Sequence, residues 1–317
     1  MSEDGREMTP VIECREVTKA YGGGRAGRKA SVRALDNISW QVGGGTIVGL
    51  VGPNGAGKTT LLSLIAGLLF PTQGTIHVCG HPARSLDARR SLGYVPESPA
   101  FLSCYSARAV LKHHAALHGL SREAIAGETE RVLSQLRLEE YADRAVGGFS
   151  QGMRQRLALA VALLDNPRLL LLDEPSNGLD PIGVIELRRI LNEVRQSGAT
   201  VIISSHRLGE LERLTSDYVF LHRGRIVQFG RDERVEQTGH LRVELLPGSP
   251  HVREDVLAPC SLVEQSDTRL VIAVNGIEDV PGVVSSLVGA GALVTGVALE
   301  MQDIEETFVR LCRERAS

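Results

Sequence analysis

Residues Gly52 to Thr59 read Gly-Pro-Asn-Gly-Ala-Gly-Lys-Thr, which matches the pattern Gly-x4-Gly-Lys-Thr without a mismatch. They follow the apolar run 46–51, which is typical of a buried strand, and open a segment, 58–68, that is expected to be helical. In such a loop the backbone N–H groups turn toward phosphate oxygens, and the positive end of the helix dipole adds to the attraction. The sequence therefore predicts a nucleoside triphosphate site with these contacts: Gly52, Pro53, Asn54, Gly55, Ala56, Gly57, Lys58, Thr59 and Thr60.

Two polar side chains of this loop have separate expected roles. Lys58 is expected to reach the β and γ phosphates, and Thr59 to offer its hydroxyl to Mg²⁺. A loop this rich in glycine is also compatible with a tight strand-to-helix turn and nothing more. The segments further along the chain favour the phosphate site.

An aliphatic strand that ends in two carboxylates follows at 168–174, which reads Arg-Leu-Leu-Leu-Leu-Asp-Glu. Such a run is typical of a parallel strand that is buried on both faces and places its polar residues at the carboxyl end, where ligands bind in open α/β sheets. Asp173 is expected to hold Mg²⁺, directly or through water, and Glu174 to polarise an attacking water.

A second buried strand, 199–206, ends in His206 at the same predicted edge of the sheet. A single histidine at such a place is often a hydrogen-bonded structural residue. Beside a γ-phosphate, the favoured interpretation is a phosphate sensor. The expected catalytic residues are therefore Lys58, Glu174 and His206.

Between these elements, Gly147 to Ala160 reads Gly-Gly-Phe-Ser-Gln-Gly-Met-Arg-Gln-Arg-Leu-Ala-Leu-Ala. Ser150 can cap a helix that starts near Gly152, which leaves backbone N–H groups aimed at an anion. Taken alone, this segment is also what an ordinary capped core helix looks like. Its order among the other motifs gives it a more specific meaning.

The phosphate loop, the Ser-x-Gly helix start, the Leu-rich strand with Asp-Glu, the run Ser176 to Asp180 and the strand ending in His206 occur in one order. In that order they resemble the ATP-binding subunit of an ABC transporter, over residues 11–230. The resemblance implies an α/β fold: a P-loop ABC ATPase domain, 1–230, that contains a helical subdomain at about 97–165. ATP and Mg²⁺ are the cofactors it implies.

The resemblance also assigns Tyr21, which follows Lys19-Ala20, to stacking on adenine. A tyrosine that only packs on the surface is the alternative. The basic, glycine-rich segment 23–31 is interpreted as an insertion that follows it.

Two motifs depart from the commonest pattern of the family. The signature reads Phe-Ser-Gln-Gly-Met at 149–153, which keeps the Ser and the second Gly, and the Gln expected after Tyr-x-Pro is replaced by Glu97. In both departures the chain resembles one subgroup, the ATPases that serve ABC-2-type exporters. These exporters act on drugs, sodium or polysaccharides, or in the maturation of a copper enzyme. Glu97 is expected near the metal and the membrane partner.

By the same resemblance the chain works as a head-to-tail homodimer, in which Ser150 and Gly152 of one copy cover the ATP bound by the other. An integral membrane transporter subunit is the expected partner, energised for export through the Glu97 region. Two alternatives are a soluble ABC ATPase that acts on ribosomes or DNA, and a regulatory nucleotide-binding module that never turns over.

Composition agrees with this assignment. The 317-residue chain can hold two domains, and its net charge of −3 argues against nucleic acid as a main partner. No apolar run approaches the roughly 20 residues that span a bilayer, and the acidic N-terminus is unlike a secretory signal. Five scattered cysteines suggest neither a disulfide framework nor a zinc site. We therefore expect a cytoplasmic protein that is peripheral on the cytoplasmic face of the cell membrane.

A second unit, 231–317, is expected after a charged linker. Its pattern predicts β-α-β-β-α-β, with a first strand at 240–246, a short helix at 250–258 and a second helix at 279–287, and it suggests a small α+β domain of ferredoxin-like type. A final helix is predicted at 304–313. No catalytic pattern occurs in this unit, so a dimerising or regulatory role is the default expectation.

Overall fold

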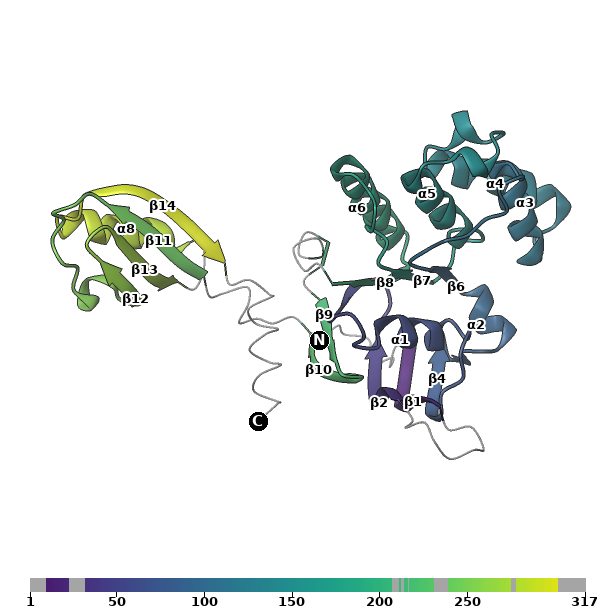
Figure 1. The fold of residues 1–317 in the computed structure, drawn as a ribbon, viewed down its shortest axis with the longest axis horizontal. Coiled ribbons are helices and arrows are strands. Elements are labelled where there is room, and N and C mark those ends of the chain that lie inside the picture. The colour runs from purple at the N-terminus through teal and green to yellow at the C-terminus, as the bar shows by residue number, and fades with distance from the viewer. Residues whose placement is uncertain are drawn as a thin grey trace, which may run out of the picture. The chain divides into compact units, whose positions relative to one another are not determined.

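The structure is a computed structural model of the chain, and it divides into two compact units, Met1–Gly230 and Arg231–Ser317 (Figure 1). The structure describes these residues: 10–22, 32–206, 211, 214–215, 217–230, 239–274 and 278–301. The segment 23–31 and the predicted helix 304–313 lie outside the described residues. No helix of the described parts is both long and apolar enough to cross a bilayer.

The first unit is built on a six-stranded sheet of order β10-β9-β3-β8-β7-β6. All neighbouring pairs are parallel except β9 and β10, so the carboxyl ends of β3, β6, β7 and β8 meet at one edge. Strands β3, β7 and β8 are buried throughout, as their apolar runs predict. The bounds are β3 Ile47–Val51, β6 Leu92–Val95, β7 Leu169–Asp173, β8 Thr200–Ser205, β9 Asp217–His222 and β10 Arg225–Gly230.

A second sheet, of order β2-β1-β4-β5, faces helix α1 from the other side. Helix α1 contacts β7 of the larger sheet and both β2 and β4 of the smaller one, so one apolar core joins the two sheets. The phosphate loop that precedes α1 is thereby held by packing on two sides. The bounds are β1 Ile12–Tyr21, β2 Val32–Val42, β4 Gln73–Val78, β5 His81–Pro82, α1 Lys58–Ile65 and α2 Leu86–Arg90.

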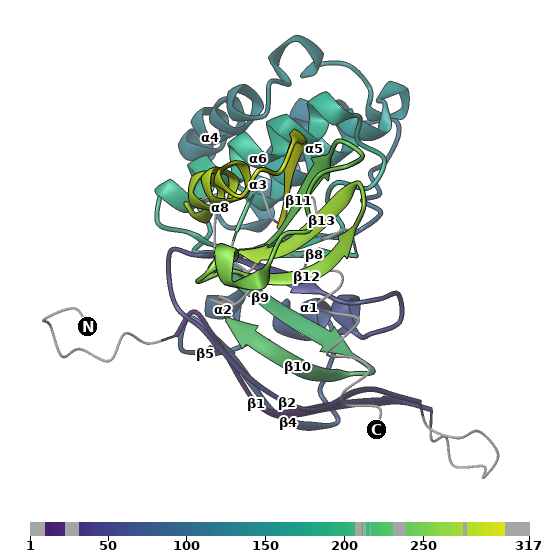
Figure 2. The same cartoon turned by 90° about the vertical axis from the view of Figure 1, so that its left-hand side faces the viewer.

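The helical subdomain gathers away from the smaller sheet, as Figures 1 and 2 both show. Its three main helices pack against one another, and each begins at a serine, Ser106, Ser121 or Ser150, whose hydroxyl accepts a hydrogen bond from the first turn. Helix α6 begins at Asp180 in the same way. The bounds are α3 Ala107–Leu117, α4 Arg122–Gln135, η1 Glu139–Tyr141, η2 Val146–Gly148, α5 Gln151–Ala162 and α6 Pro181–Gln196.

The second unit is a four-stranded antiparallel sheet of order β12-β13-β11-β14, with its own apolar core. Its strands and helices follow the β-α-β-β-α-β order of a ferredoxin-like unit, with one difference. The helix predicted at 250–258 is only a short 3-10 turn, which ends before Ala258 because Pro259 disfavours a helical residue in front of it. The bounds are β11 Gly239–Leu245, η3 Glu254–Leu257, β12 Ser261–Ser266, β13 Arg269–Val274, α8 Asp279–Gly289 and β14 Val294–Met301.

Candidate functional site

A cavity of about 440 Å³ lies at the shared carboxyl edge of β3, β6, β7 and β8. Most of the residues expected to bind a triphosphate line it, together with the residues that follow β6, β7 and β8. The lining residues are Ala34, Pro53, Asn54, Gly55, Gly57, Lys58, Thr59, Thr60, Glu97, Glu174 and His206.

The backbone of the phosphate loop needs its glycines for two different reasons. Gly55 has a φ of +80° and open space around it, so its absent side chain leaves room on the cavity side. A Cβ on Gly52 would lie 2.3 Å from the carbonyl oxygen of Leu221 in β9. Gly52 therefore permits close packing of β3 on β9, and neither it nor the buried Ala56 lines the cavity.

Helix α1 opens without a side-chain cap. Gly57, at the N-cap, has a φ of +110° and offers no hydrogen-bonding side chain to the first turn. The first N–H groups of the helix consequently remain available at the cavity, where they favour an anion. This geometry is what the loop pattern predicts for a phosphate.

Lys58 is almost completely buried and points back across the loop. Its Nζ donates to the carbonyl oxygen of Gly52 at 2.6 Å and lies 3.3 Å from Glu174 Oε1. A buried ammonium needs partners of opposite charge, because its desolvation is costly otherwise. The contacts with Gly52 and Glu174 hold the Lys58 ammonium group in place beside the cavity.

Glu174 lies at the centre of the polar residues in the cavity. Its φ of +48° turns the chain sharply after β7, and its backbone N–H donates to Ser204 Oγ at 2.9 Å. Its carboxylate contacts Lys58 through Oε1 and lies 2.8 Å from His206 Nδ1 through Oε2. Lys58 and His206, the other two residues expected to be catalytic, thus each contact the carboxylate of Glu174.

Asp173 is fully buried and only half satisfied. Its Oδ1 accepts a hydrogen bond from Ser204 Oγ at 2.7 Å, whereas its Oδ2 has no hydrogen-bond partner among the described residues. Burial and the charge of Asp173 raise the pKa of Tyr94, on neighbouring β6. An orphaned carboxylate oxygen is a fitting ligand for a hard cation such as Mg²⁺.

Ser204 is a site residue that sequence reasoning missed. It stands directly beside Asp173 in the parallel register of β7 and β8 and bridges Asp173 to the backbone of Glu174. Counting back from the carboxyl ends of the two predicted strands, 168–174 and 199–206, pairs Asp173 with Ser205, one residue away from the true partner, so the sequence alone does not identify Ser204.

Glu97 lines the cavity but is exposed, and its Oε1 accepts from Asn177 Nδ2 at 3.5 Å. Within the described residues no group of three or more His, Cys, Asp or Glu side chains is arranged to hold a metal. Mg²⁺ typically takes one or two protein carboxylates and completes its shell with water and phosphate oxygens. The residues present therefore fit that ion without a closed protein cage.

Tyr21 lies at the end of β1, exposed, with Lys19 Nζ 5.0 Å from the centre of its ring. It is not among the described residues that line the cavity. Its stacking on adenine stays a prediction.

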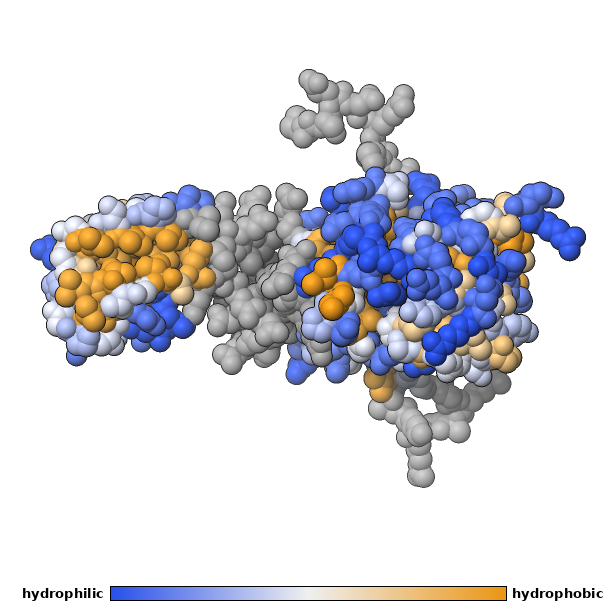
Figure 3. All heavy atoms as spheres, turned by 90° about the horizontal axis from the view of Figure 1, so that it is seen from above, coloured by the Kyte–Doolittle hydropathy of each residue, from blue (hydrophilic) through white to orange (hydrophobic). Residues whose placement is uncertain are grey.

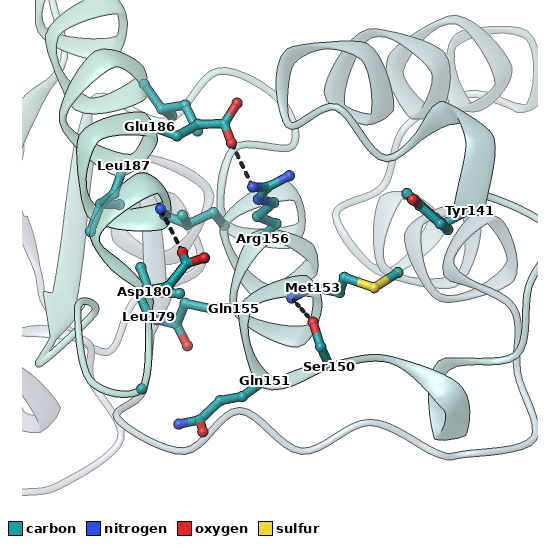
Figure 4. Close-up of a pocket in the computed structure, with 15 residues that line it drawn as sticks. Tyr141, Ser150, Gln151, Met153, Gln155, Arg156, Leu179, Asp180, Glu186 and Leu187 are labelled. Carbon is teal, nitrogen blue, oxygen red and sulfur yellow. Dashed lines mark hydrogen bonds and ion pairs between the residues drawn. The ribbon is translucent and has the colours of Figure 1, made fainter.

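Ser150 and Gly152 line a second cavity, of about 390 Å³, between α5 and α6 (Figure 4). Ser150 Oγ accepts from the Met153 N–H at 3.2 Å and caps α5, as predicted. A Cβ on Gly152 would meet only Leu179 Cδ2, at 3.6 Å, which is an ordinary contact. The chain's own packing therefore does not require glycine at 152.

The start of α5 is tied to the loop before α6. Gln151 Nε2 donates to the carbonyl oxygen of Asn177 at 3.2 Å and lies over Gly178, where a Cβ would clash with it. Further along the two helices, Arg156 Nη2 lies 2.5 Å from Glu186 Oε2 (Figure 4). The signature segment and the loop 174–180 consequently form one connected surface.

The comparisons with known proteins agree with this geometry. The family model described as ABC transporter matches residues 35–177. The uncharacterised ABC transporter ATP-binding protein YxlF of Bacillus subtilis is 34% identical over 88% of this chain and 94% of its own length. The chain belongs to the ABC transporter ATP-binding proteins.

Two further comparisons bear on activity. The Nod factor export ATP-binding protein I of Cupriavidus metallidurans is 34% identical over 83% of this chain and 84% of its own. The dimeric, post-hydrolysis structure of the ATP-binding cassette MJ0796 with ADP and Pi has a TM-score of 0.63 and 25% identity, covering 69% of this chain and 98% of that one. This ABC protein is accordingly an ATP-binding, ATP-hydrolysing transporter subunit with the P-loop ABC ATPase fold.

Proposed function

We propose that this subunit binds Mg·ATP in the cavity around Lys58 and Glu174 and hydrolyses it as a head-to-tail homodimer. The energy serves export through a separate integral membrane subunit at the cytoplasmic face of the membrane. The observation that carries the proposal is the convergence of Lys58, Glu174 and His206 on one cavity that Ser150 and Gly152 do not line. The two halves of an ABC-type site are present, and a second copy would bring them together.

The surroundings of Gly152 support the composite site. Among the described residues a side chain there would meet only an ordinary contact with Leu179, yet glycine gives an outside ligand the closest approach to the backbone. Ser150 caps α5 with its Oγ, and the positive end of this 12-residue helix favours a phosphate group. Both features suit the γ-phosphate of ATP held by the other copy.

Asp173, through its orphaned Oδ2, and the Thr59 hydroxyl would hold Mg²⁺. When bound, the ion neutralises charge on the phosphate oxygens. Glu97 would stand near its water shell without belonging to a cluster of protein ligands.

The residues of the chain itself position the reactants. Lys58 and the N–H groups of α1 hold the phosphates, and Glu174 orients a water or accepts its proton as the water attacks the γ-phosphorus. His206, in contact with Glu174, is placed to sense the phosphate and to hold the carboxylate. Fixed charges and dipoles of this kind supply most of the lowering of the barrier in phosphoryl transfer.

The membrane partner is assigned to the segment between β6 and α3. This segment follows Glu97 and exposes two large apolar side chains, Leu102 at 68% and Tyr105 at 50% of their surface. Exposed apolar side chains beside a nucleotide cavity suit a docking surface that moves with the nucleotide state. Export, rather than import, is proposed for two reasons. The signature 149–153 and Glu97 resemble the exporter subgroup, and one relative is named a Nod factor export ATP-binding protein.

Mild-detergent purification from membranes tests the proposal. We expect the chain to co-purify with an integral membrane protein that stimulates its Mg·ATP turnover. Leu102→Glu should abolish co-purification and leave basal turnover intact, whereas Ile185→Glu, an equally exposed site on α6, should change neither. Failure to co-purify with any membrane protein would contradict the transport role, and absence of basal turnover would favour the regulatory module.

A further inference from the structure

Strand β14 forms one edge of the sheet in the second unit and pairs only with β11 among the described strands. An edge strand presents a row of N–H and C=O groups that can pair with another chain, and proteins usually protect it with charge, proline or a cover. The run Val294 to Leu299, six of the eight residues of β14, contains neither a charged residue nor a proline, and Glu300 is the one charged residue of the strand. Over the run 294–299 the edge therefore lacks the usual protection.

The opposite edge of the same sheet differs. Both edge strands contain one glutamate, and the pairing of each with its neighbour shifts register once. Strand β12 is the more polar of the two, with Ser261, Glu264, Gln265 and Ser266 among its six residues. The apolar run of β14 makes it the edge better suited to further pairing.

An exposed apolar surface accompanies β14. Val297 in the strand, Leu293 just before it and Val288 at the end of α8 expose 42%, 53% and 57% of their surface. Figure 1 draws β14 at the top of this unit, and the view from above in Figure 3 shows one broad apolar surface on the unit. This surface continues the core, because Val294 and Val284 pack against it from the same strand and helix.

The register of β14 shows which of its side chains belong to the helix-covered face. Val297 pairs with Val243 and Leu299 with Leu241 in β11. Val243 and Leu241 are fully buried in the core beneath α8, so Val297 and Leu299 lie on that face too. Ala298, between them, lies on the other face.

We propose that two copies of this chain pair through β14, antiparallel, about a two-fold axis at Ala298. In this register Val297 of each copy lies opposite Leu299 of the other, on the face covered by α8. The pairing satisfies the free backbone groups, joins the two sheets into one of eight strands and covers the apolar surface beside α8. Cross-strand apolar pairs of this kind stabilise a sheet.

A second copy fits this edge better than an unrelated partner. The run 294–299 has no charge with which to select a different protein, and its apolar positions are complementary to themselves in the register above, where Glu300 lies opposite Gly296 of the other copy. The proposal relies on the proposed function at one point. The ATPase dimer holds two copies together, which raises the effective concentration of the second edge.

Cysteine cross-linking in the full chain tests the register. In a background with Cys104 and Cys312 replaced by Ser, Ala298→Cys should form a disulfide-linked dimer under mild oxidation, because facing residues of an antiparallel pair have Cβ atoms about 4.5–5.5 Å apart. Val263→Cys, exposed on β12, is the matched control and should remain monomeric on a denaturing gel. Equal cross-linking of the two variants would overturn the proposal.

A charge on the edge separates this pairing from the ATPase dimer. Val297→Lys should abolish the dimer that the nucleotide-free chain forms, as measured by sedimentation. Combined with Glu174→Gln, it should still allow the ATP-dependent dimer to form. Failure of Glu174→Gln, with Val297 unchanged, to form an ATP-dependent dimer would count against the proposed head-to-tail site and would leave the β14 pairing standing. A nucleotide-free dimer that survives Val297→Lys would overturn the β14 pairing.

Discussion

Lys58 Nζ lies 3.3 Å from Glu174 Oε1, and both side chains are more than nine-tenths buried. His206 contacts the other oxygen of the same carboxylate. The γ-phosphate of ATP carries the same sign of charge as Glu174 and would compete with it for both partners. We infer that nucleotide entry frees Glu174 to face the attacking water, which couples binding to catalytic alignment.

Glu174→Gln tests the role of this carboxylate. The amide keeps the size of the side chain and can still accept from Lys58, so Mg·ATP should bind. Turnover should fall at least about 10²-fold, the usual contribution of a general base. The variant should accumulate as an ATP-bound dimer, measured by size-exclusion chromatography and phosphate release. Glu193→Gln, at a partly exposed glutamate of α6 that pairs with Arg189, serves as the control, and near-normal turnover in Glu174→Gln would remove Glu174 from catalysis.

Ser204→Ala tests whether Ser204 holds Asp173 in place, without changing a residue expected to be catalytic. Without the hydroxyl, Asp173 Oδ1 and the Glu174 N–H lose their shared partner in the interior. Leaving buried polar groups unpaired costs about 1–3 kcal/mol, and a mobile Asp173 should raise the Mg²⁺ concentration needed for half-maximal turnover. Ser197→Ala also loses a hydroxyl bond, to Val194, but Ser197 precedes the amino end of β8, the end away from the site, and the change should leave the Mg²⁺ requirement unchanged. Equal Mg²⁺ dependence of both variants would contradict the bridging role.

Cys14 gives the first unit a predictable loss of stability in alkali. Burial raises the pKa of its thiol to about 12, above the value of about 8.5 in an unfolded chain. Because the folded pKa is the higher one, the stabilisation is complete below pH about 8.5 and is lost as the pH rises toward 12. Between pH 8 and pH 10 the thiol alone should lower the free energy of unfolding by about 2 kcal/mol.

Denaturant titrations followed by Trp40, the single tryptophan, measure this effect, because Trp40 pairs with Cys14 across β1 and β2. Cys14→Ala should change the free energy of unfolding by a constant amount at neutral pH. It should lack the further decrease in that free energy that the thiol causes in alkali. An identical pH profile in both proteins would mean that the thiol ionises freely in the folded chain.

The polar edge of the sheet was predictable because parallel strands end at the same place. Glu174 and His206 each follow a predicted strand of the parallel set, and the phosphate loop follows another, so finding these strands was enough to bring them together. Glu97 follows β6, which was not predicted as a strand, and its place near the site came from the family resemblance.

Other features depend on contacts that no local pattern encodes. Gly52 was expected to contact phosphate, but its lack of a side chain serves the approach of Leu221, far away in the sequence. Ser204 becomes important only through its register with Asp173. The helix expected at 250–258 is only the 3-10 turn Glu254–Leu257, and Pro259 accounts for its end alone, because a proline restricts just the residue before it.

Glu97→Ala tests the connection to the membrane subunit. Glu97 lines the nucleotide cavity, contacts Asn177 and precedes the exposed segment with Leu102. Removing the carboxylate should abolish stimulation of turnover by the reconstituted membrane subunit and leave nucleotide affinity largely unchanged. Glu97→Gln, which keeps a hydrogen-bond acceptor for Asn177, should retain most of the stimulation. If the membrane subunit stimulates the turnover of Glu97→Ala fully, Glu97 does not couple turnover to the membrane subunit.

The composite site predicts complementation between two inactive variants. Lys58→Ala removes the phosphate ligand of a copy's own cavity, and Gly152→Asp places a like charge where the copy would cover its partner's γ-phosphate. Because the surroundings of Gly152 accommodate a side chain, the second variant should fold normally. In the mixed dimer one site carries both defects and the other carries none.

Trapping of labelled nucleotide by the mixed dimer is the measurement, since one intact site can bind without completing a full cycle of two. We expect the mixture to trap label where each variant alone does not. Gly127→Asp, a change at an open position of α4, is the matched charge control and should trap normally by itself. If heterodimers form and trap no more than the single variants, Ser150 and Gly152 do not close the partner's site, and the head-to-tail mechanism fails with them.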